Sequence, residues 1–156
     1  MTLEIFTDGS YKKKNNKIYC GYGIYFPNSE LQNVSRPFIH EPLTNQRAEL
    51  YAILKALRNV IRFKIKYDNI IIYTDSEYSI KCVTLWYKTW EKNNWINSKN
   101  ETVLNQDIIR PIIKIVKYLG SKIIFKHVRS HTGKQDYASI NNDMADKLAS
   151  NGALLS

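Results

Sequence analysis

Short apolar runs separated by polar breaks predict three antiparallel strands in the first part of the chain. Residues 3–7 form an apolar run, and a lysine- and asparagine-rich turn at 12–17 separates it from a second run at 19–26. Because both runs have the length of a strand, we expect a hairpin. Residues 31–39 are expected to return as a third strand, which Pro37 places toward the edge of the sheet.

The pattern changes from strand to helix at Asn45. Apolar residues then recur at steps of three and four, which marks one face of a long helix that Thr44 would cap. They are Leu50, Ile53, Leu54, Leu57 and Ile61. Residues 70–74 form a short apolar strand, and a helical stretch follows from Ser76. Strand, helix and strand in this order imply a parallel crossover.

The last third of the chain predicts a further helix, a fifth strand and a final helix. Apolar residues in 103–119 form a helical stripe, in which Pro111 is expected to kink or restart the helix. Residues 121–128 alternate as a strand, 129–139 form a polar loop and 141–150 form a short helix. The sum is one α/β domain over the whole chain, with a mixed five-stranded sheet of three antiparallel strands and then two parallel ones, flanked by helices.

The segment 84–101 combines tryptophans with lysines, and all three tryptophans of the chain fall in it. Trp86 and Trp90 lie one helical turn apart, so they either pack a small local core or stack on the sugars and bases of a nucleic acid. The lysines of this segment would attract phosphate groups. They are Lys88, Lys92 and Lys99.

Composition and charge favour a polyanionic partner. The chain has 156 residues, of which 44% are hydrophobic, so one domain with a sizeable core is expected. Its 23 Lys and Arg against 14 Asp and Glu leave a net charge of +9, which points to nucleic acid. Cys20 and Cys82 lie far apart, no signal peptide is visible and no apolar run could cross a membrane. We therefore expect an intracellular monomer without membrane contact.

Four acidic residues fall where folding would bring them together. Asp8 and Asp75 each follow an apolar run in the sequence Thr-Asp, so on neighbouring strands their carboxylates would share one edge of the sheet. Glu49 lies beside the apolar stripe of its helix and can point toward that sheet. Asp146 has apolar neighbours on the last helix, where an unpaired charge would be costly, so it needs a partner or a cation.

Each acid alone also has a structural interpretation. Asp75 suits a turn or a helix cap, Glu49 suits the helix dipole, and Asp143 or Asp146 could be solvated. Four carboxylates together would repel one another and raise one another's pKa, which favours a bound divalent cation. Ligands that are all oxygen favour Mg²⁺ or Mn²⁺ over zinc.

Five segments, in order, resemble the motifs of the type 1 ribonucleases H, and the match runs along essentially the whole chain. These segments are 7–10, 44–50, 74–76, 128–133 and 142–149. The segment 84–101 resembles the basic protrusion, or handle, of that family. The resemblance implies the RNase H-like fold, and no separate hybrid-binding domain is expected because the first catalytic strand begins at Leu3.

The resemblance also implies an activity, which is hydrolysis of the RNA strand of RNA–DNA hybrids to leave 5′-phosphate and 3′-hydroxyl ends. Two Mg²⁺ ions would take part, with Mn²⁺ as a possible substitute. Asp8 would bridge both ions, and Asp146 would complete the ion that activates water. Glu49 and Asp75 would hold the other ion.

Further residues are implied by the same resemblance. His131 would carry protons or aid product release, unless it is only a solvated loop residue, and Asp143 would assist there. Asn45 and Gln46 would contact ribose hydroxyls and base edges, unless they only cap the helix. Asn16 would contact RNA in a first hairpin that is rich in lysine and asparagine where many relatives carry glycine and proline.

Two rival classes stay open at this stage. One is a non-catalytic hybrid-binding domain of the same fold, against which the four intact acids argue. The other comprises integrases, transposases and junction resolvases, which also cluster carboxylates around Mg²⁺ but lack the motif at 44–49 and the histidine loop. The stretch 134–141 is expected to be a long loop, which would alter the placement of His131.

Overall fold

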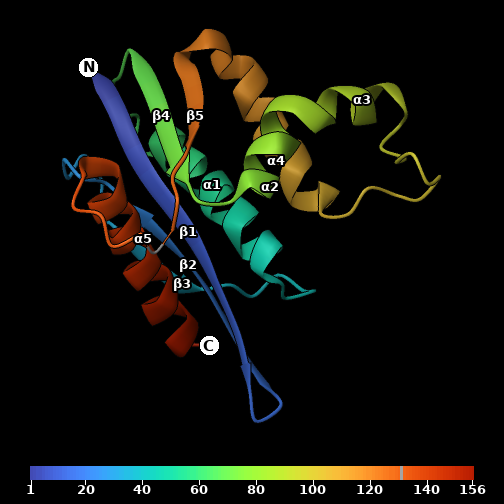
Figure 1. Cartoon of the computed structure of the whole chain (residues 1–156). Helices are drawn as coiled ribbons and strands as arrows, with labels where there is room; N and C mark the ends of the chain where they lie inside the picture. Colours follow the sequence, from blue (N-terminus) through green and yellow to red (C-terminus); the bar gives the residue numbers. More distant parts are fainter. Residues whose placement is uncertain (131) are drawn as a thin grey trace.

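The computed structural model describes residues 1–130 and 132–156, and its centre is a five-stranded sheet in the order β3-β2-β1-β4-β5 (Figure 1). Strands β1, β2 and β3 pair antiparallel, whereas β1, β4 and β5 pair parallel. The predicted mixed sheet is therefore confirmed. The strands are β1 (Thr2–Lys14), β2 (Lys17–Tyr25), β3 (Val34–Pro37), β4 (Asn69–Thr74) and β5 (Ile123–His127).

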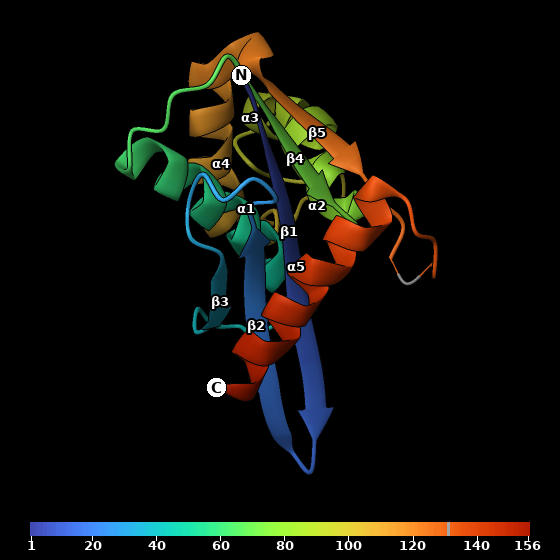
Figure 2. The same ribbon diagram turned by 90° about the vertical axis from the view of Figure 1, so that its left-hand side faces the viewer.

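Helices cover both faces of this sheet. Helices α1 and α4 lie on one face and α5 lies on the other, as Figure 2 shows. The α5 helix can approach closely because a Cβ at Gly21 or Gly23 would collide with its backbone. The helices are α1 (Asn45–Arg62), α2 (Glu77–Lys81), the π-helix η1 (Cys82–Trp86), α3 (Tyr87–Lys92), α4 (Gln106–Leu119), the 3₁₀ turn η2 (Gly120–Lys122) and α5 (Tyr137–Leu154).

The main core lies between the sheet and the pair α1 and α4. Leu50, Ile53 and Leu57 of the predicted α1 stripe are buried, although Ile61 near the helix end is 48% exposed. The predicted cap is also confirmed, since the Thr44 side chain accepts a hydrogen bond from the backbone N–H of Arg47. Apolar burial on one face therefore sets the position of α1. Within the described residues, no helix is long and apolar enough to cross a membrane.

The predicted strands differ in length from the observed ones, most of all the first, the third and the fifth, which covers only Ile123–His127 rather than 121–128 because Gly120–Lys122 form the turn η2. Strand β1 continues to Lys14, so the predicted turn at 12–17 shrinks to Asn15 and Asn16, whose φ values of 52° and 62° suit a two-residue hairpin turn. The exposed lysines of β1 adopt strand conformation because their backbone pairs with β2. The third strand covers only Val34–Pro37 rather than 31–39.

The predictions for the last two long helices were wrong in part. Helix α4 runs from Gln106 to Leu119 without a restart at Pro111, and its buried isoleucines pack in the core. Leu104 lies before this helix and is 75% exposed. Helix α5 starts at Tyr137 rather than at 141, since Asp136 caps it by accepting a hydrogen bond from the Ser139 N–H. The stretch after residue 131 is therefore shorter than predicted.

Candidate metal centre

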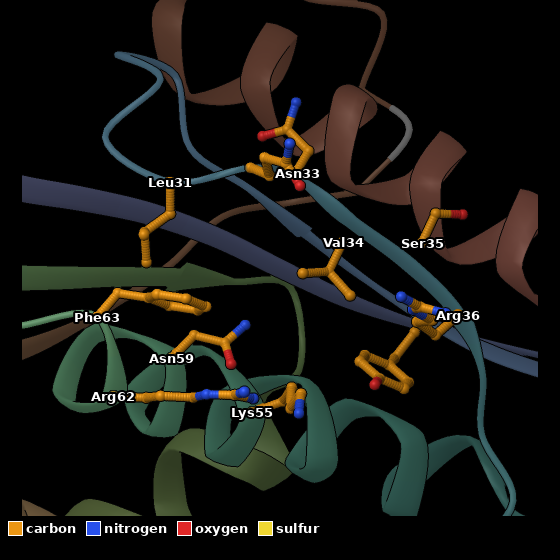
Figure 3. A pocket seen from close by; sticks show the side chains of 11 residues that line it. Leu31, Asn33, Val34, Ser35, Arg36, Lys55, Asn59, Arg62 and Phe63 are labelled. Atoms are coloured by element: carbon orange, nitrogen blue, oxygen red, sulfur yellow. The ribbon is translucent and has the colours of Figure 1, made fainter.

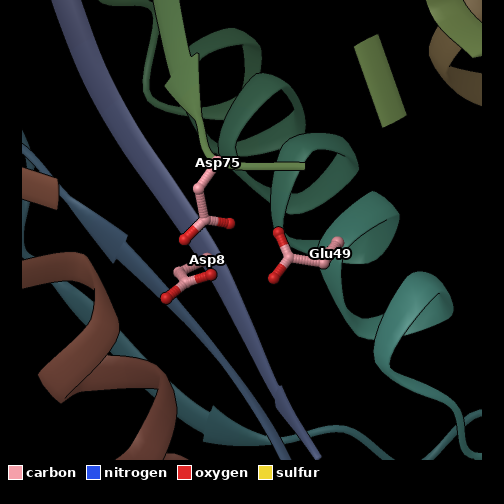
Figure 4. A group of neighbouring side chains, drawn as sticks. All are labelled: Asp8, Glu49 and Asp75. Carbon is pink, nitrogen blue, oxygen red and sulfur yellow. The ribbon is translucent and has the colours of Figure 1, made fainter. Parts of the chain in front are cut away.

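Three carboxylates from three separate elements meet at one end of the parallel strands. Asp8 lies on β1, Asp75 directly follows β4 and Glu49 lies on α1, and Figure 4 shows their side chains turned toward one another. One oxygen from each carboxylate lies within 4.8 Å of the others. Asp8 and Glu49 are 2% and 3% exposed, so the group is largely withdrawn from water. The predicted convergence of these three acids is found in the structure.

Gly9 permits this arrangement. A Cβ at Gly9 would lie 2.6 Å from the backbone nitrogen of Glu49, so only glycine lets α1 pack this close to β1. The Gly9 N–H donates to Glu49 Oε1 at 2.8 Å and to Asp8 Oδ1 at 2.9 Å. Thr74 Oγ1 adds a longer contact of 3.5 Å to Glu49 Oε2. One backbone donor thus holds two carboxylates side by side.

Burial and mutual repulsion raise the pKa of both buried acids. Loss of solvation raises the pKa of Asp8 first, and the nearby charges of Glu49 and then Asp75 raise it further. For Glu49, burial likewise raises the pKa, while hydrogen bonds from Asp8, Gly9 and Thr74 act against that increase. A divalent cation would remove the repulsion and favour the ionised form of both groups.

Asp146 approaches the group from the opposite face of the sheet. It lies on α5, is half-buried, and a hydrogen bond with its side chain contributes to the raised pKa of Asp8. Asp143 lies one helical turn earlier and is half-buried too. The donor set that surrounds Asp8 therefore consists of carboxylate oxygens, which fits Mg²⁺ or Mn²⁺ and fits neither zinc nor copper well.

The predicted substrate-binding residues of α1, Asn45 and Gln46, lie near the acidic cluster, whereas Asn16 of the first hairpin lies far from it. Asn45 and Gln46 are exposed at the start of α1, one turn from Glu49, and Thr44 rather than either amide caps the helix. Asn16 is exposed at the tip of the hairpin, eight residues along the strand from Asp8. At about 3.4 Å per residue this separation is about 27 Å. That Asn16 contacts nucleic acid stays a prediction. Such a contact would involve a part of the nucleic acid that lies this far from the acidic cluster.

Aromatic rings join the handle segment to the core. The ring of Trp86 lies 6.0 Å from Tyr78 and from Trp90, and Trp90 lies 5.9 Å from Trp95. Trp95 is 7% exposed and belongs to the core, whereas Trp86 and Trp90 are half-buried against it. These contacts support the packing interpretation. The lysines Lys88, Lys92 and Lys99 are exposed.

A buried cation that the sequence analysis did not single out links α1 to α4. Arg47 is 3% exposed and makes two hydrogen bonds of 2.8 Å to the carboxylate of Asp107. It also donates to the backbone carbonyls of His40 and Glu41. In the sequence, the only sign that Arg47 has a role is that it lies between the amide residues Asn45 and Gln46 and the candidate ligand Glu49. His131 lies outside the described residues.

Comparisons with known proteins agree with this geometry. Residues 1–154 match the sequence family described as RNase H. A "Probable ribonuclease H" of Acanthamoeba polyphaga mimivirus is 40% identical over 134 residues, which cover 85% of this chain and 58% of that protein. A "Ribonuclease H" of Schizosaccharomyces pombe is 34% identical over 150 residues, which cover 96% of this chain and 52% of that protein. The chain thus spans about half the length of these curated relatives.

A solved structure extends the comparison to the fold. A foamy viral protease-reverse transcriptase, solved in complex with RNA/DNA hybrid, matches with a TM-score of 0.78 and 23% identity, over 99% of this chain and 20% of that chain. Sheet order, helix placement and the acidic cluster define an α/β protein of the RNase H-like fold with a carboxylate site suited to divalent cations. The sequence match along nearly the whole chain narrows this class: the chain belongs to the RNase H family.

Proposed function

We propose that this chain is an endoribonuclease that hydrolyses the RNA strand of RNA–DNA hybrids and leaves 5′-phosphate and 3′-hydroxyl ends. The observation that carries the proposal is the cluster of Asp8 on β1, Glu49 on α1 and Asp75 just after β4, two of them buried, in a member of the RNase H family. The names of the two curated relatives are consistent with it. Phosphodiester hydrolysis needs charge stabilisation at both the attacking and the leaving oxygen.

The proposed roles of the acids come from the motif resemblance and are compatible with their positions. Asp8 interacts with Glu49, Asp75 and Asp146 and would contact two divalent ions, taken to be Mg²⁺ with Mn²⁺ as a substitute. Asp146 would hold one ion from α5, and Glu49 with Asp75 would hold the other from α1 and β4. When bound, the ions would lower the pKa of water and neutralise charge on the leaving oxygen. Gly9 keeps Asp8 and Glu49 oriented through its N–H.

The remaining assignments concern substrate and proton transfer. Asn45 and Gln46 are exposed one turn from Glu49, so their amides could reach ribose hydroxyls and base edges in a minor groove. His131 would exchange protons near the acids, and Asp143, one turn from Asp146, would assist it. These roles rest on the motif resemblance and on the neighbouring geometry.

The whole chain would act as one catalytic domain and as a monomer. The handle at residues 84–101 and the net charge of +9 would supply affinity for the hybrid backbone. Cys20 and Cys82 are free and buried, which suits a reducing intracellular compartment. No separate hybrid-binding domain is required in this proposal.

A cleavage assay on matched substrates tests the function. End-labelled RNA is supplied in a hybrid, in duplex RNA and as a single strand, each with Mg²⁺, with Mn²⁺ or with EDTA. We expect metal-dependent cleavage of RNA only in the hybrid, and its loss in Asp8→Asn. Asp68→Asn, which removes one exposed negative charge before the start of β4, at the opposite end of that strand from Asp75, is the matched control and should cleave like the wild type.

The rival classes give different results in the same assay. Cleavage of a DNA duplex without ribose would place the chain with integrase- or transposase-like enzymes. If the folded protein binds the hybrid but does not cleave it with either Mg²⁺ or Mn²⁺, it is a non-catalytic binding domain. Full activity of Asp8→Asn would overturn the assigned metal centre.

A further inference from the structure

A second concave site lies at the edge of the sheet, away from the acidic cluster. A cavity of about 630 Å³ opens between α1, strand β3 and the loop before β3 (Figure 3). Lys55, Asn59 and Arg62 of α1 line one side, and Val34 and Arg36 of β3 line the other. A volume of about 300–1,000 Å³ is typical of small-ligand sites. The cavity therefore has room for a ligand of the size of a nucleotide.

The cavity lies further along α1 than the proposed metal centre. Its lining begins at Lys55, six residues after Glu49, and ends near Arg62, 13 residues after Glu49, which is about 9 Å to about 20 Å at 1.5 Å per residue. Glu49 points to the strands β1 and β4, whereas the cavity lies beside the edge strand β3. A ligand in this cavity would occupy a separate site.

The charges around the cavity are positive and unpaired. Arg36, Lys55 and Arg62 line it, and no aspartate or glutamate does so among the described residues. None of these three cations takes part in an ion pair within the described part of the chain. The acid on the neighbouring loop, Glu30, is not among the residues that line the cavity. Cations gathered without counter-charges around a hollow favour a phosphate-bearing ligand.

The cavity also offers groups for an aromatic base. Phe63 is 55% exposed at one end, and the Arg62 guanidinium lies 5.4 Å from its ring. The Asn59 side chain points into the space beside it (Figure 3). A flat base can stack on an exposed phenyl ring and form hydrogen bonds with an amide, as in single-strand nucleic-acid sites.

We propose that this cavity is a second ligand site that binds a nucleotide, with its phosphates held by Arg36, Lys55 and Arg62 and its base placed against Phe63. The nucleotide can be free or can be one unit of a single strand that extends from a nucleic acid. Both sources present the same chemistry to the cavity. The site is independent of the cleavage reaction.

Calorimetric titration in EDTA tests the site without metal at the acidic cluster. ATP is titrated into the full chain and into two double variants that lose equal charge. Lys55→Gln/Arg62→Gln removes two lining cations, whereas Arg58→Gln/Lys66→Gln removes two exposed cations that do not line the cavity. We expect the first pair to weaken ATP binding about tenfold or more and the second pair to leave it nearly unchanged. Equal weakening by both pairs would overturn the site.

Two further binding experiments identify the ligand. Phe63→Ala should weaken the binding of ATP but leave that of inorganic triphosphate unchanged, and equal affinity of wild type for both would overturn the nucleotide assignment. A short thymidine oligonucleotide that competes with ATP would identify a single strand as the source, whereas absence of competition would identify a free nucleotide. Both results support the site.

Cleavage of a short blunt hybrid separates this inference from the proposed function. Lys55→Gln/Arg62→Gln should cleave it like the wild type, and a matched loss of cleavage would make the cavity part of the hybrid path rather than a second site. If the wild type cleaves no hybrid, the titrations in EDTA remain decisive for the cavity, so the two proposals can fail separately.

Discussion

Asp8 and Glu49 keep their carboxyl groups side by side and out of water, at a free-energy cost that the rest of the fold offsets. Burial and the adjacent acids raise the pKa of both groups above that of an exposed acid. The folded protein therefore holds protons on them more tightly than the unfolded chain does. Without metal, this tighter proton binding stabilises the folded protein below about pH 4, which is the pKa of these acids in the unfolded chain. The stabilisation is lost as the pH rises toward their pKa in the folded protein.

Asp8→Asn should stabilise the metal-free protein while it abolishes cleavage. The amide cannot ionise, so the variant should unfold in EDTA at a temperature about 2–4 °C higher than the wild type at neutral pH, which corresponds to about 1 kcal/mol for a chain of this size. The gap should widen between about pH 5 and pH 8. Thermal unfolding followed by circular dichroism measures it.

Added Mg²⁺ provides the control for this prediction. A cation that binds only the folded wild type should raise its unfolding temperature and reduce the gap to Asp8→Asn. A variant that is less stable than wild type at every pH would show that the Asp8 carboxylate is held by favourable contacts rather than by metal.

At the scale of elements, Arg47 connects the start of α1 to α4 and to the segment before α1. Its guanidinium is buried, and it pairs with Asp107 and with two backbone carbonyls. This contact holds α1, the helix that carries Glu49, against α4, the helix that follows the handle segment. The hydrogen bond and charge of Arg47 lower the pKa of Asp107. The pair therefore stabilises the fold above about pH 4, and its contribution is lost as the pH falls through that lowered value.

Asp107→Asn should destabilise the protein by about 2 kcal/mol at neutral pH, because it leaves the buried Arg47 charge without a counter-charge. This is less than the loss of a fully buried pair, since the Asp107 side chain is 62% exposed and solvent screens its charge. The difference from wild type should shrink as the pH falls below about 4, where the unfolded chain binds a proton at Asp107, and should be lost below the lowered pKa of Asp107 in the folded protein. Urea unfolding at several pH values measures the effect. Asp136→Asn, whose side chain caps α5 without a buried cation, serves as the comparison. A loss that does not change with pH would contradict an electrostatic origin.

The tryptophans of the handle segment should differ in what they contribute. Trp95 is buried beside Trp90 and beneath Arg110, so Trp95→Ala should cost about 3–5 kcal/mol of unfolding free energy. Trp86→Phe keeps a ring against Tyr78 and should cost much less. Urea unfolding compares the two variants. Equal stability of Trp95→Ala and wild type would show that the handle segment folds independently of this ring.

At the scale of the whole molecule, the sequence predicts those elements that bury one apolar face. The stripe of α1 and the apolar β4 were recognised for this reason, and so was the meeting of Asp8 with Asp75, since parallel neighbours end at one edge. Elements stabilised by other contacts were missed. The exposed end of β1 depends on pairing with β2, and the start of α5 depends on a cap. Arg47 and Asp107 lie 60 residues apart, so no local pattern connects them.

The distribution of positive charge predicts which part of the molecule binds the hybrid. Lys88, Lys92 and Lys99 lie in the handle segment, and Lys12–Lys14 lie near the tip of the first hairpin, which projects at the opposite end of the molecule to α3 in both views (Figures 1 and 2). Both groups hold three exposed cations. They therefore allow a comparison in which the net charge is constant and only the position differs.

Substitution of the three handle lysines by glutamine should weaken hybrid binding and reduce the slope of log affinity against log salt by about one unit for each lysine that contacts a phosphate. The same substitution at Lys12–Lys14 should change the slope less, because only the far end of a bound hybrid would reach the hairpin tip, about 27 Å from Asp8. Binding is measured by fluorescence anisotropy over a range of salt concentrations in the Asp8→Asn background, which prevents cleavage of the probe. Equal slopes for the two triple variants would mean that the handle neutralises no more phosphates than the hairpin does, which would contradict the special role assigned to the handle.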